Sequence, residues 1–177
     1  MKSEVRAPKS EIGPLVFIAL GSNLGDPVAN VRAAMDRLES LSATPLLRSS
    51  LWHSTPVDCP PGSPPFVNAI VGLQPLAGET PETLLAKLQA LEREFGRRPK
   101  TVLNEPRPLD LDLLAFGAEV RASAGLILPH PRAHLRRFVL APLAEIAADA
   151  VLPGWSATAA ELLDTLRTGE SVQRLPD

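Results

Sequence analysis

Two aspartates in an apolar segment are the side chains of this chain best suited to chemistry. Asp110 and Asp112 alternate with leucines over residues 109–114. Side chains alternate between the faces of a β-strand, so the two carboxylates share one face, roughly 7 Å apart, while the leucines point into a core. Like charges this close require compensation, and a hard divalent cation such as Mg²⁺, which prefers oxygen ligands, supplies it. Two solvated acids on an edge strand are the alternative.

Basic side chains surround this pair, although the whole chain has a net charge of −2. Residues 96–137 contain eight Arg or Lys and four Asp or Glu, two of which are Asp110 and Asp112. The loop before the aspartates carries Arg97, Arg98, Lys100 and Arg107. Such a loop can bind phosphate oxygens through guanidinium groups and close over a triphosphate. The charge balance argues against a general nucleic-acid binder, and a solvated basic surface is the alternative reading of the loop.

Amide and carboxyl side chains elsewhere offer further polar contacts. Asn68 lies inside an apolar strand, where a buried amide must donate and accept, as the edge of a heterocycle requires. Bonding to the backbone is the alternative. Gln89 and Glu92 are three residues apart on an expected helix and share a polar edge, which is also typical of a solvated helix face.

A last cluster of candidate ligand contacts surrounds two prolines at 129 and 131. His130 and Arg136 can contact phosphate, and Phe138 can stack on a flat ring. Structural roles for these side chains are the alternative. The sequence has no Gly-x-x-x-x-Gly-Lys-Ser/Thr segment, so a P-loop enzyme is excluded.

Hydrophobic patterning and turn residues predict the elements that position these side chains. The expected core elements are a strand at 15–20, a helix at 27–42, strands at 46–54 and 66–73, a helix at 81–95 and a strand at 109–116. Their order predicts an α+β fold, a ferredoxin-like βαββαβ core with a mostly antiparallel sheet and helices packed on it. A hairpin near residue 120 and helices near 142–148 and 158–166 form a C-terminal helical extension. The loops at 55–65 and 97–108 are long enough to be functional.

Length and composition place these elements in one domain, at residues 15–170, after a disordered extension at 1–14. The single Cys59 forms no intrachain disulfide, which fits a reducing, cytoplasmic setting. No apolar run approaches the ~20 residues of a membrane span. We expect a monomer that binds small molecules, with neither a membrane nor a nucleic acid as partner.

Five segments and a sixth near the C-terminus resemble the 6-hydroxymethyl-7,8-dihydropterin pyrophosphokinase family. They are residues 21–25 (GSNLG), 66–69 (FVNA), 96–97 (GR), 106–112 (PRPLDLD), 128–132 (LPHPR) and 138–147 (FVLAPLAEIA). Their order and spacing agree with the family from about residue 16 to 166. The resemblance implies an enzyme of folate biosynthesis that transfers the terminal diphosphate of ATP to the pterin hydroxymethyl group and releases AMP.

The resemblance also assigns roles to residues of this chain. It places two Mg²⁺ ions at Asp110 and Asp112 and gives catalytic roles to Arg97, Arg107, Asp110 and Asp112. It places ATP, the co-substrate, at Gln89, Glu92, Lys100, Arg107, Leu113, His130 and Arg136. It places the hydroxymethyl dihydropterin at Thr55, Pro56, Val57, Phe66, Asn68, Asp110 and Phe138.

Several positions depart from the family pattern, most of them in the two long loops. Asn104 stands where many members have Trp, Pro99 where Arg is common, and Glu105 where Gly is common; Phe66 replaces a Tyr of some members, and Asp58 is unusual. Two other functions stay open: an RNA-binding module on a ferredoxin-like sheet, and another metal-dependent phosphate or nucleotidyl enzyme that uses the same aspartates.

Overall fold

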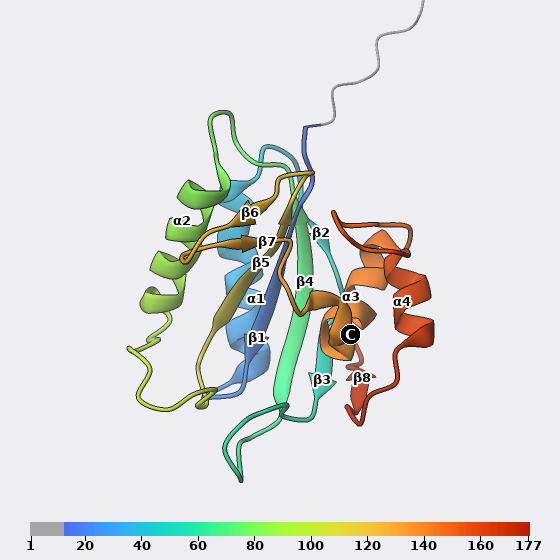
Figure 1. Cartoon of the computed structure of the whole chain (residues 1–177). Helices are drawn as coiled ribbons and strands as arrows, with labels where there is room; N and C mark the ends of the chain where they lie inside the picture. Colours follow the sequence, from blue (N-terminus) through green and yellow to red (C-terminus); the bar gives the residue numbers. More distant parts are fainter. Residues whose placement is uncertain (1–12) are drawn as a thin grey trace, which may run out of the picture.

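The computed structural model describes residues 13–177, which surround a central antiparallel sheet (Figure 1). Of the extension expected at 1–14, residues 1–12 lie outside the described part. The core elements are β1 (Val16–Ser22), α1 (Pro27–Leu38), β3 (Trp52–Ser54), β4 (Phe66–Leu73), α2 (Pro81–Glu94) and β5 (Asp110–Phe116). The others are the 3-10 helices η1 (Glu39–Leu41) and η2 (Ala133–Leu135), the strands β2 (Leu47–Arg48), β6 (Arg121–Ala122), β7 (Ile127–Leu128) and β8 (Val172–Arg174), and the helices α3 (Arg137–Ala147) and α4 (Ala159–Thr165).

The strand order of the main sheet confirms the predicted α+β, ferredoxin-like core. The order is β5-β1-β4-β3-β8, and all the strand pairs described are antiparallel. The first strand of the chain therefore lies in the sheet between β4 and β5. Strand β8 extends the sheet beyond β3 and lies past the expected domain boundary at residue 170, which itself stays a prediction.

Helices cover both faces of the sheet. On one face, Ile18 and Leu20 of β1 pack with buried side chains of α1 and α2; on the other, Phe17 and Ile70 pack with α3 and α4 (Figure 1). The RNA-binding alternative requires aromatic side chains on an open sheet face for base stacking, whereas Phe17 and Phe116 of the sheet are buried in the described structure. No helix within this range is long and apolar enough to cross a membrane.

The two core helices begin at the residues that the sequence indicates. The Asp26 side chain accepts a hydrogen bond from Ala29 N–H (3.0 Å), and Pro27 occupies the first turn of α1. Thr80 caps α2 in a reciprocal capping box with Thr83. These caps satisfy backbone donors that the first helical turn leaves without partners, and so they fix where each helix starts.

The prediction of one strand at 46–54 is wrong, because the segment forms two short strands, β2 and β3. Arg48 pairs with Val71, whereas Trp52 pairs with Asn68, so one extra residue is accommodated between them. Ser49 bridges the break: its backbone N–H donates to Ile70 O, and its hydroxyl accepts from Ile70 N–H (2.9 Å). This irregularity is equivalent to a bulge, which sequence periodicity does not reveal.

The helix expected to begin near Pro142 begins five residues earlier, at Arg137. Proline usually marks a helix start because it lacks the N–H that an interior position donates. Here Pro142 lies inside α3, and the buried side chains Val139, Leu140 and Leu143 hold that helix on the sheet. Apolar packing therefore outweighs the one hydrogen bond that is lost.

Glu145 fastens α3 to the strand segment at residues 50–52. Its carboxylate accepts hydrogen bonds from Ser50 N–H (3.1 Å), from the Ser50 hydroxyl (2.5 Å) and from Trp52 Nε1–H (3.0 Å). Burial raises the pKa of Glu145, but the hydrogen bonds from Ser50 and Trp52 lower it by more, so the net pKa is below its usual value.

We expect Glu145→Gln to reduce the free energy of unfolding at pH 7 by about 1–2 kcal/mol, since a charged acceptor of several donors is lost. A depressed folded-state pKa stabilises the protein above the unfolded pKa of about 4.5, and that stabilisation is lost as the pH falls through the folded pKa. Urea unfolding at pH 7 and at pH 3 measures this. The difference in the free energy of unfolding between variant and wild type should be smaller at pH 3 than at pH 7. Glu94→Gln, at an exposed ion pair with Arg37, is the control and should cost under about 0.5 kcal/mol.

Candidate active site

A cavity that is open to solvent and encloses about 680 Å³ of empty space lies on the α3 face of the sheet. The two long loops project from this end of the sheet, at the bottom of Figure 1. Small residues of β1 form the cavity floor. Gly21 pairs with Asn68 on one side and Asp110 on the other, and Ala19 pairs with Asp112. A Cβ on Gly21 would lie 3.4 Å from the Asn68 Oδ1, so a larger side chain here would fill the space between the amide and the carboxylates. The other lining residues are Leu20, Ser54, Thr55, Val57, Asp58, Cys59, Phe66, Ala69, Asn104, Arg107, Arg136 and Phe138.

The two aspartates lie on one face of β5, as predicted from their spacing, and both line this cavity. Leu111 and Leu113 between and after them are buried in the opposite core. Burial first, and the nearby Asp110 carboxylate second, raise the pKa of Asp112 from 3.8 to about 7 against the opposing charge of Arg136. The pair therefore concentrates negative charge that the protein compensates only in part, as a cation site does.

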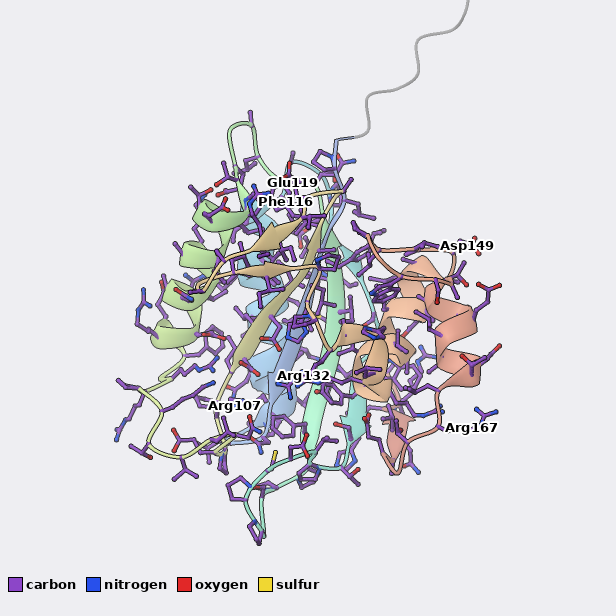
Figure 2. The ribbon with its side chains drawn as sticks, viewed as in Figure 1. Arg107, Phe116, Glu119, Arg132, Asp149 and Arg167 are labelled. Atoms are coloured by element: carbon purple, nitrogen blue, oxygen red, sulfur yellow. The ribbon has the colours of Figure 1, made fainter. Side chains whose placement is uncertain are left out.

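Two arginines lie against Asp110. Arg97 Nη1 donates to Asp110 Oδ1 (2.6 Å), and Arg107 Nε lies 3.3 Å from Asp110 Oδ2. The Arg107 Nε is close enough to Asp110 for an ion pair, but the two groups are not oriented for a hydrogen bond. This buried Nε therefore has no hydrogen-bond partner among the described residues. Figure 2 shows Arg107 where the loop at 97–108 returns to β5. An arginine so placed retains a free donor close to the carboxylates.

Glu92 is buried, which the prediction of a polar helix edge did not foresee. Its carboxylate accepts a hydrogen bond from Leu111 N–H (2.7 Å) and another from Arg97 Nη1. Burial raises the pKa of Glu92, although the Leu111 N–H and Arg97 act against this increase. Gln89, its predicted partner, is exposed on α2, and neither residue lines the three cavities described here. The structure thus separates two side chains that the sequence placed together.

Two aromatic rings and a buried amide line the part of the cavity between β4 and α3. The Phe66 and Phe138 rings both line it, with the Arg107 guanidinium 5.6 Å from the first ring centre and the Arg136 guanidinium 5.4 Å from the second. The buried Asn68 Nδ2 donates to the Ser54 hydroxyl (2.6 Å). This bond fixes the amide orientation, and the Asn68 Oδ1 faces the cavity floor at Gly21.

A second cavity lies on the outer side of β5, and Asp112 lines both cavities. Its walls include Leu113 and His130, two of the residues predicted to contact ATP, together with Leu85, Leu111, Ala124, Gly125, Leu126, Ile127 and Pro131. Burial, together with the charges of Arg136 and Arg132, lowers the pKa of His130 to about 4. The His130 Nδ1 accepts from Arg132 N–H (3.2 Å), so a neutral ring carries its proton on Nε2 as a donor.

The basic loop borders a third cavity, lined by Arg97, Lys100 and Arg107 among others. Lys100 is exposed in this loop. Glu105, an acid that is unusual for the family, binds within its own loop: it accepts from Thr101 N–H (3.2 Å) and from the Thr101 hydroxyl (2.8 Å). The Glu105 carboxylate is thus bound by Thr101, and four basic residues, Arg97, Arg98, Lys100 and Arg107, line the same cavity.

Sequence analysis missed several positioning residues. Asn23 accepts a hydrogen bond from Arg107 N–H (2.9 Å) through its Oδ1 and donates through Nδ2 to Pro64 O (3.1 Å), so it ties both long loops to the end of β1. The sequence signal for such a residue is an asparagine in a glycine-rich turn, because its side chain can hydrogen-bond two backbone groups at once. Of the three neighbouring residues predicted to contact the pterin, Thr55 and Val57 line the first cavity and Pro56 does not.

The two long loops contact each other over the cavity. Asn104 Nδ2 donates to Asp58 O (2.7 Å), and both residues have positive φ, 55° and 52°. We expect Asn104→Asp, which keeps a residue that tolerates this conformation but removes the donor, to increase proteolytic cleavage in both loops by up to about tenfold. Limited proteolysis of the folded protein measures this. Val102→Ala in the same loop is the control, and equal cleavage of the two variants would contradict the contact.

Comparison with known proteins places this arrangement in a family. The model of the family described as 7,8-dihydro-6-hydroxymethylpterin-pyrophosphokinase (HPPK) matches residues 17–148. The chain is 40% identical over 137 residues to the 2-amino-4-hydroxy-6-hydroxymethyldihydropteridine pyrophosphokinase of Haemophilus influenzae, covering 77% of this chain and 84% of that protein. It is 42% identical over 139 residues to the protein of the same name from Pseudomonas aeruginosa, covering 78% and 83%.

Solved structures agree on the fold. An HPPK-DHPS structure in complex with substrates superposes with a TM-score of 0.67 at 10% identity, covering 85% of this chain and 43% of that one. Wild-type Plasmodium falciparum HPPK-DHPS with pteroate gives a TM-score of 0.66 at 11% identity, covering 85% and 42%. The chain thus spans less than half the length of these structures.

Proposed function

The chain belongs to the 7,8-dihydro-6-hydroxymethylpterin-pyrophosphokinase family, and on that premise we propose that it transfers diphosphate from ATP to the hydroxymethyl group of 6-hydroxymethyl-7,8-dihydropterin, leaving AMP. One observation carries this proposal: Asp112 lines two cavities at once. A ligand in each cavity would meet its partner at the carboxylate pair. A transfer between two bound molecules requires this juxtaposition.

The cation of this reaction is Mg²⁺ in our proposal, held as two ions by Asp110 and Asp112. The donor set fits, because Mg²⁺ is usually bound by one or two carboxylates and completes its shell with phosphate oxygens and water. Within residues 13–177 no cluster of three or more metal-ligating side chains is present, and in this proposal phosphate oxygens and water supply the remaining ligands. Bound there, the ions would neutralise the charge of the triphosphate.

The pterin occupies the first cavity in this proposal, between the rings of Phe66 and Phe138. The buried Asn68 amide contacts the edge of the heterocycle, and Thr55 and Val57 border it, while a contact with Pro56 stays a prediction. Asp110 orients the hydroxymethyl oxygen, which lies at the same end of the cavity. The rings and the amide on one wall and the carboxylates on the other support this orientation.

The nucleotide occupies the second cavity, where its base lies against Leu113 and the ribose near His130. The neutral His130 can donate from Nε2 at that wall. Arg97, Lys100, Arg107 and Arg136 contact the phosphates. A direct contact of Gln89 or Glu92 with ATP stays a prediction, and the position of the Glu92 carboxylate outside the cavities favours an indirect role.

The chain's own groups contribute mainly position and charge. The hydroxymethyl oxygen attacks the β-phosphorus as the bond to the α-phosphate oxygen breaks, so charge develops on the bridging and β-phosphate oxygens. Arg97 and Arg107 lie where guanidinium donors can stabilise that charge, and the unpartnered Arg107 Nε is available to one oxygen. The two long loops, joined at Asn104, exclude water that would otherwise hydrolyse ATP.

The expected cytoplasmic location and monomeric state stay predictions.

Product analysis tests this function. The purified protein is incubated with ATP, MgCl₂ and 6-hydroxymethyl-7,8-dihydropterin, and nucleotides and pterins are separated by anion-exchange chromatography. We expect AMP and a diphosphorylated pterin in equal amounts, and neither product without the pterin or with EDTA. Formation of ADP, or of AMP with free diphosphate whether or not the pterin is present, would support another metal-dependent phosphate enzyme instead.

A further inference from the structure

The Arg97 guanidinium is shared between two carboxylates that have different surroundings. One nitrogen, Nη1, donates both to Asp110 Oδ1 (2.6 Å) and to Glu92 Oε1. Asp110 lines the substrate cavity, whereas Glu92 lines none of the three cavities. Arg97 therefore lies on the boundary between the cavity and the protein interior.

Glu92 is fixed from both directions. Its side chain is only 10% exposed, and Oε1 accepts Leu111 N–H (2.7 Å) from the strand that carries the aspartates. Arg97 N–H also donates to the Glu92 backbone carbonyl (3.0 Å) as the chain leaves α2. These bonds hold the Glu92 carboxylate beside Arg97 whether or not Arg97 contacts Asp110.

We propose that Arg97, which lies against Asp110 together with Arg107, is a resident counter-cation of Asp110, and that a divalent cation binds Asp110 only as Arg97 moves away to Glu92 and the phosphates. This inference rests on the proposed function. Arg97 covers the Asp110 oxygen that a metal ion would need, and two cations in contact with one carboxylate repel each other. Glu92 is a positioning residue: it keeps the displaced guanidinium beside the cavity and so makes the exchange reversible.

Binding of Mn²⁺, used as a probe without nucleotide, tests the exchange. Electron paramagnetic resonance of free Mn²⁺ gives the dissociation constant for each variant. We expect Arg97→Gln to bind Mn²⁺ about tenfold more tightly than wild type, since a directly competing cation is removed. Arg97→Lys, which keeps the charge, should stay near wild type. The matched control is Arg93→Gln, an exposed arginine on the same helix end, with a change under about twofold.

The role of Glu92 has its own test. We expect Glu92→Gln, in which the amide oxygen can still accept Leu111 N–H, to weaken Mn²⁺ binding about threefold, because Arg97 then has Asp110 as its one carboxylate partner. In the double variant with Arg97→Gln this weakening should vanish, since Glu92 acts through Arg97. A threefold loss that persists in the double variant would show that Glu92 acts on the metal directly and would overturn its positioning role.

The outcomes separate this inference from the function on which it rests. If wild type binds Mn²⁺ in an Asp112-dependent manner but Arg97→Gln binds no more tightly than Arg93→Gln, the counter-cation role is wrong and the metal site stands. If Asp112→Asn leaves Mn²⁺ binding unchanged, the metal site itself is wrong, and the exchange with it. Circular dichroism of each variant confirms that it is folded before titration.

Discussion

Asp112→Asn should reduce kcat for AMP formation by at least about 1,000-fold, because the charge that anchors the metal-bound triphosphate between the two cavities is removed. Steady-state rates at saturating ATP, pterin and MgCl₂ measure this. Asp149→Asn is the control, since Asp149 is exposed and lies away from the cavities (Figure 2). Activity of Asp112→Asn within tenfold of wild type would show that this carboxylate has no essential role in the reaction.

The same substitution should not destabilise the metal-free protein. The pKa of Asp112 is raised from 3.8 to about 7 by burial and by Asp110, so the folded state holds a proton that the unfolded state has released. The contribution of Asp112 to stability is therefore fully present below its unfolded pKa of 3.8 and is lost as the pH rises to about 7, opposite in sign to the contribution of Glu145. Thermal unfolding in EDTA measures it as the difference in Tm between Asp112→Asn and wild type, which should change in favour of the variant as the pH rises through this range.

Asn68→Ala should lower kcat/KM for the pterin about 100-fold, mainly through KM, with KM for ATP unchanged. A buried amide that hydrogen-bonds a ligand contributes strongly to the affinity and selectivity of the cavity for that ligand, and both are lost when the amide is removed. The amide is held by Ser54, so Ser54→Ala should have a smaller effect of the same kind, about threefold to tenfold. Steady-state kinetics with each substrate varied in turn separates the two constants. An equal rise in both KM values would mean that the variant disturbs the site generally.

The strand at the centre of the site was predictable because its pattern is local. Alternation over residues 109–114 fixes which side chains share a face, and the structure places Asp110 and Asp112 on one side and Leu111 on the other. The element order likewise predicted the ferredoxin-like pairing, and hence that both long loops open at the carboxylate end of the sheet.

Other parts of the site depend on contacts that no local pattern encodes. Glu92 follows Gln89 at helical spacing, but its burial results from the Leu111 N–H of another element. The cavity floor requires Gly21 and Ala19 to lie between β4 and β5, which is a property of sheet register. Helix α3 begins before Pro142 because tertiary packing overrides a local helix-breaking signal.

Crystals grown with Mn²⁺ and α,β-methylene-ATP, which cannot be cleaved at the transferred bond, test the central claim most directly through the anomalous scattering of manganese. The account predicts anomalous peaks within coordination distance of both the Asp110 and Asp112 carboxylates, with the triphosphate on them and Arg97 withdrawn from Asp110. Manganese and triphosphate bound away from these two side chains would contradict it.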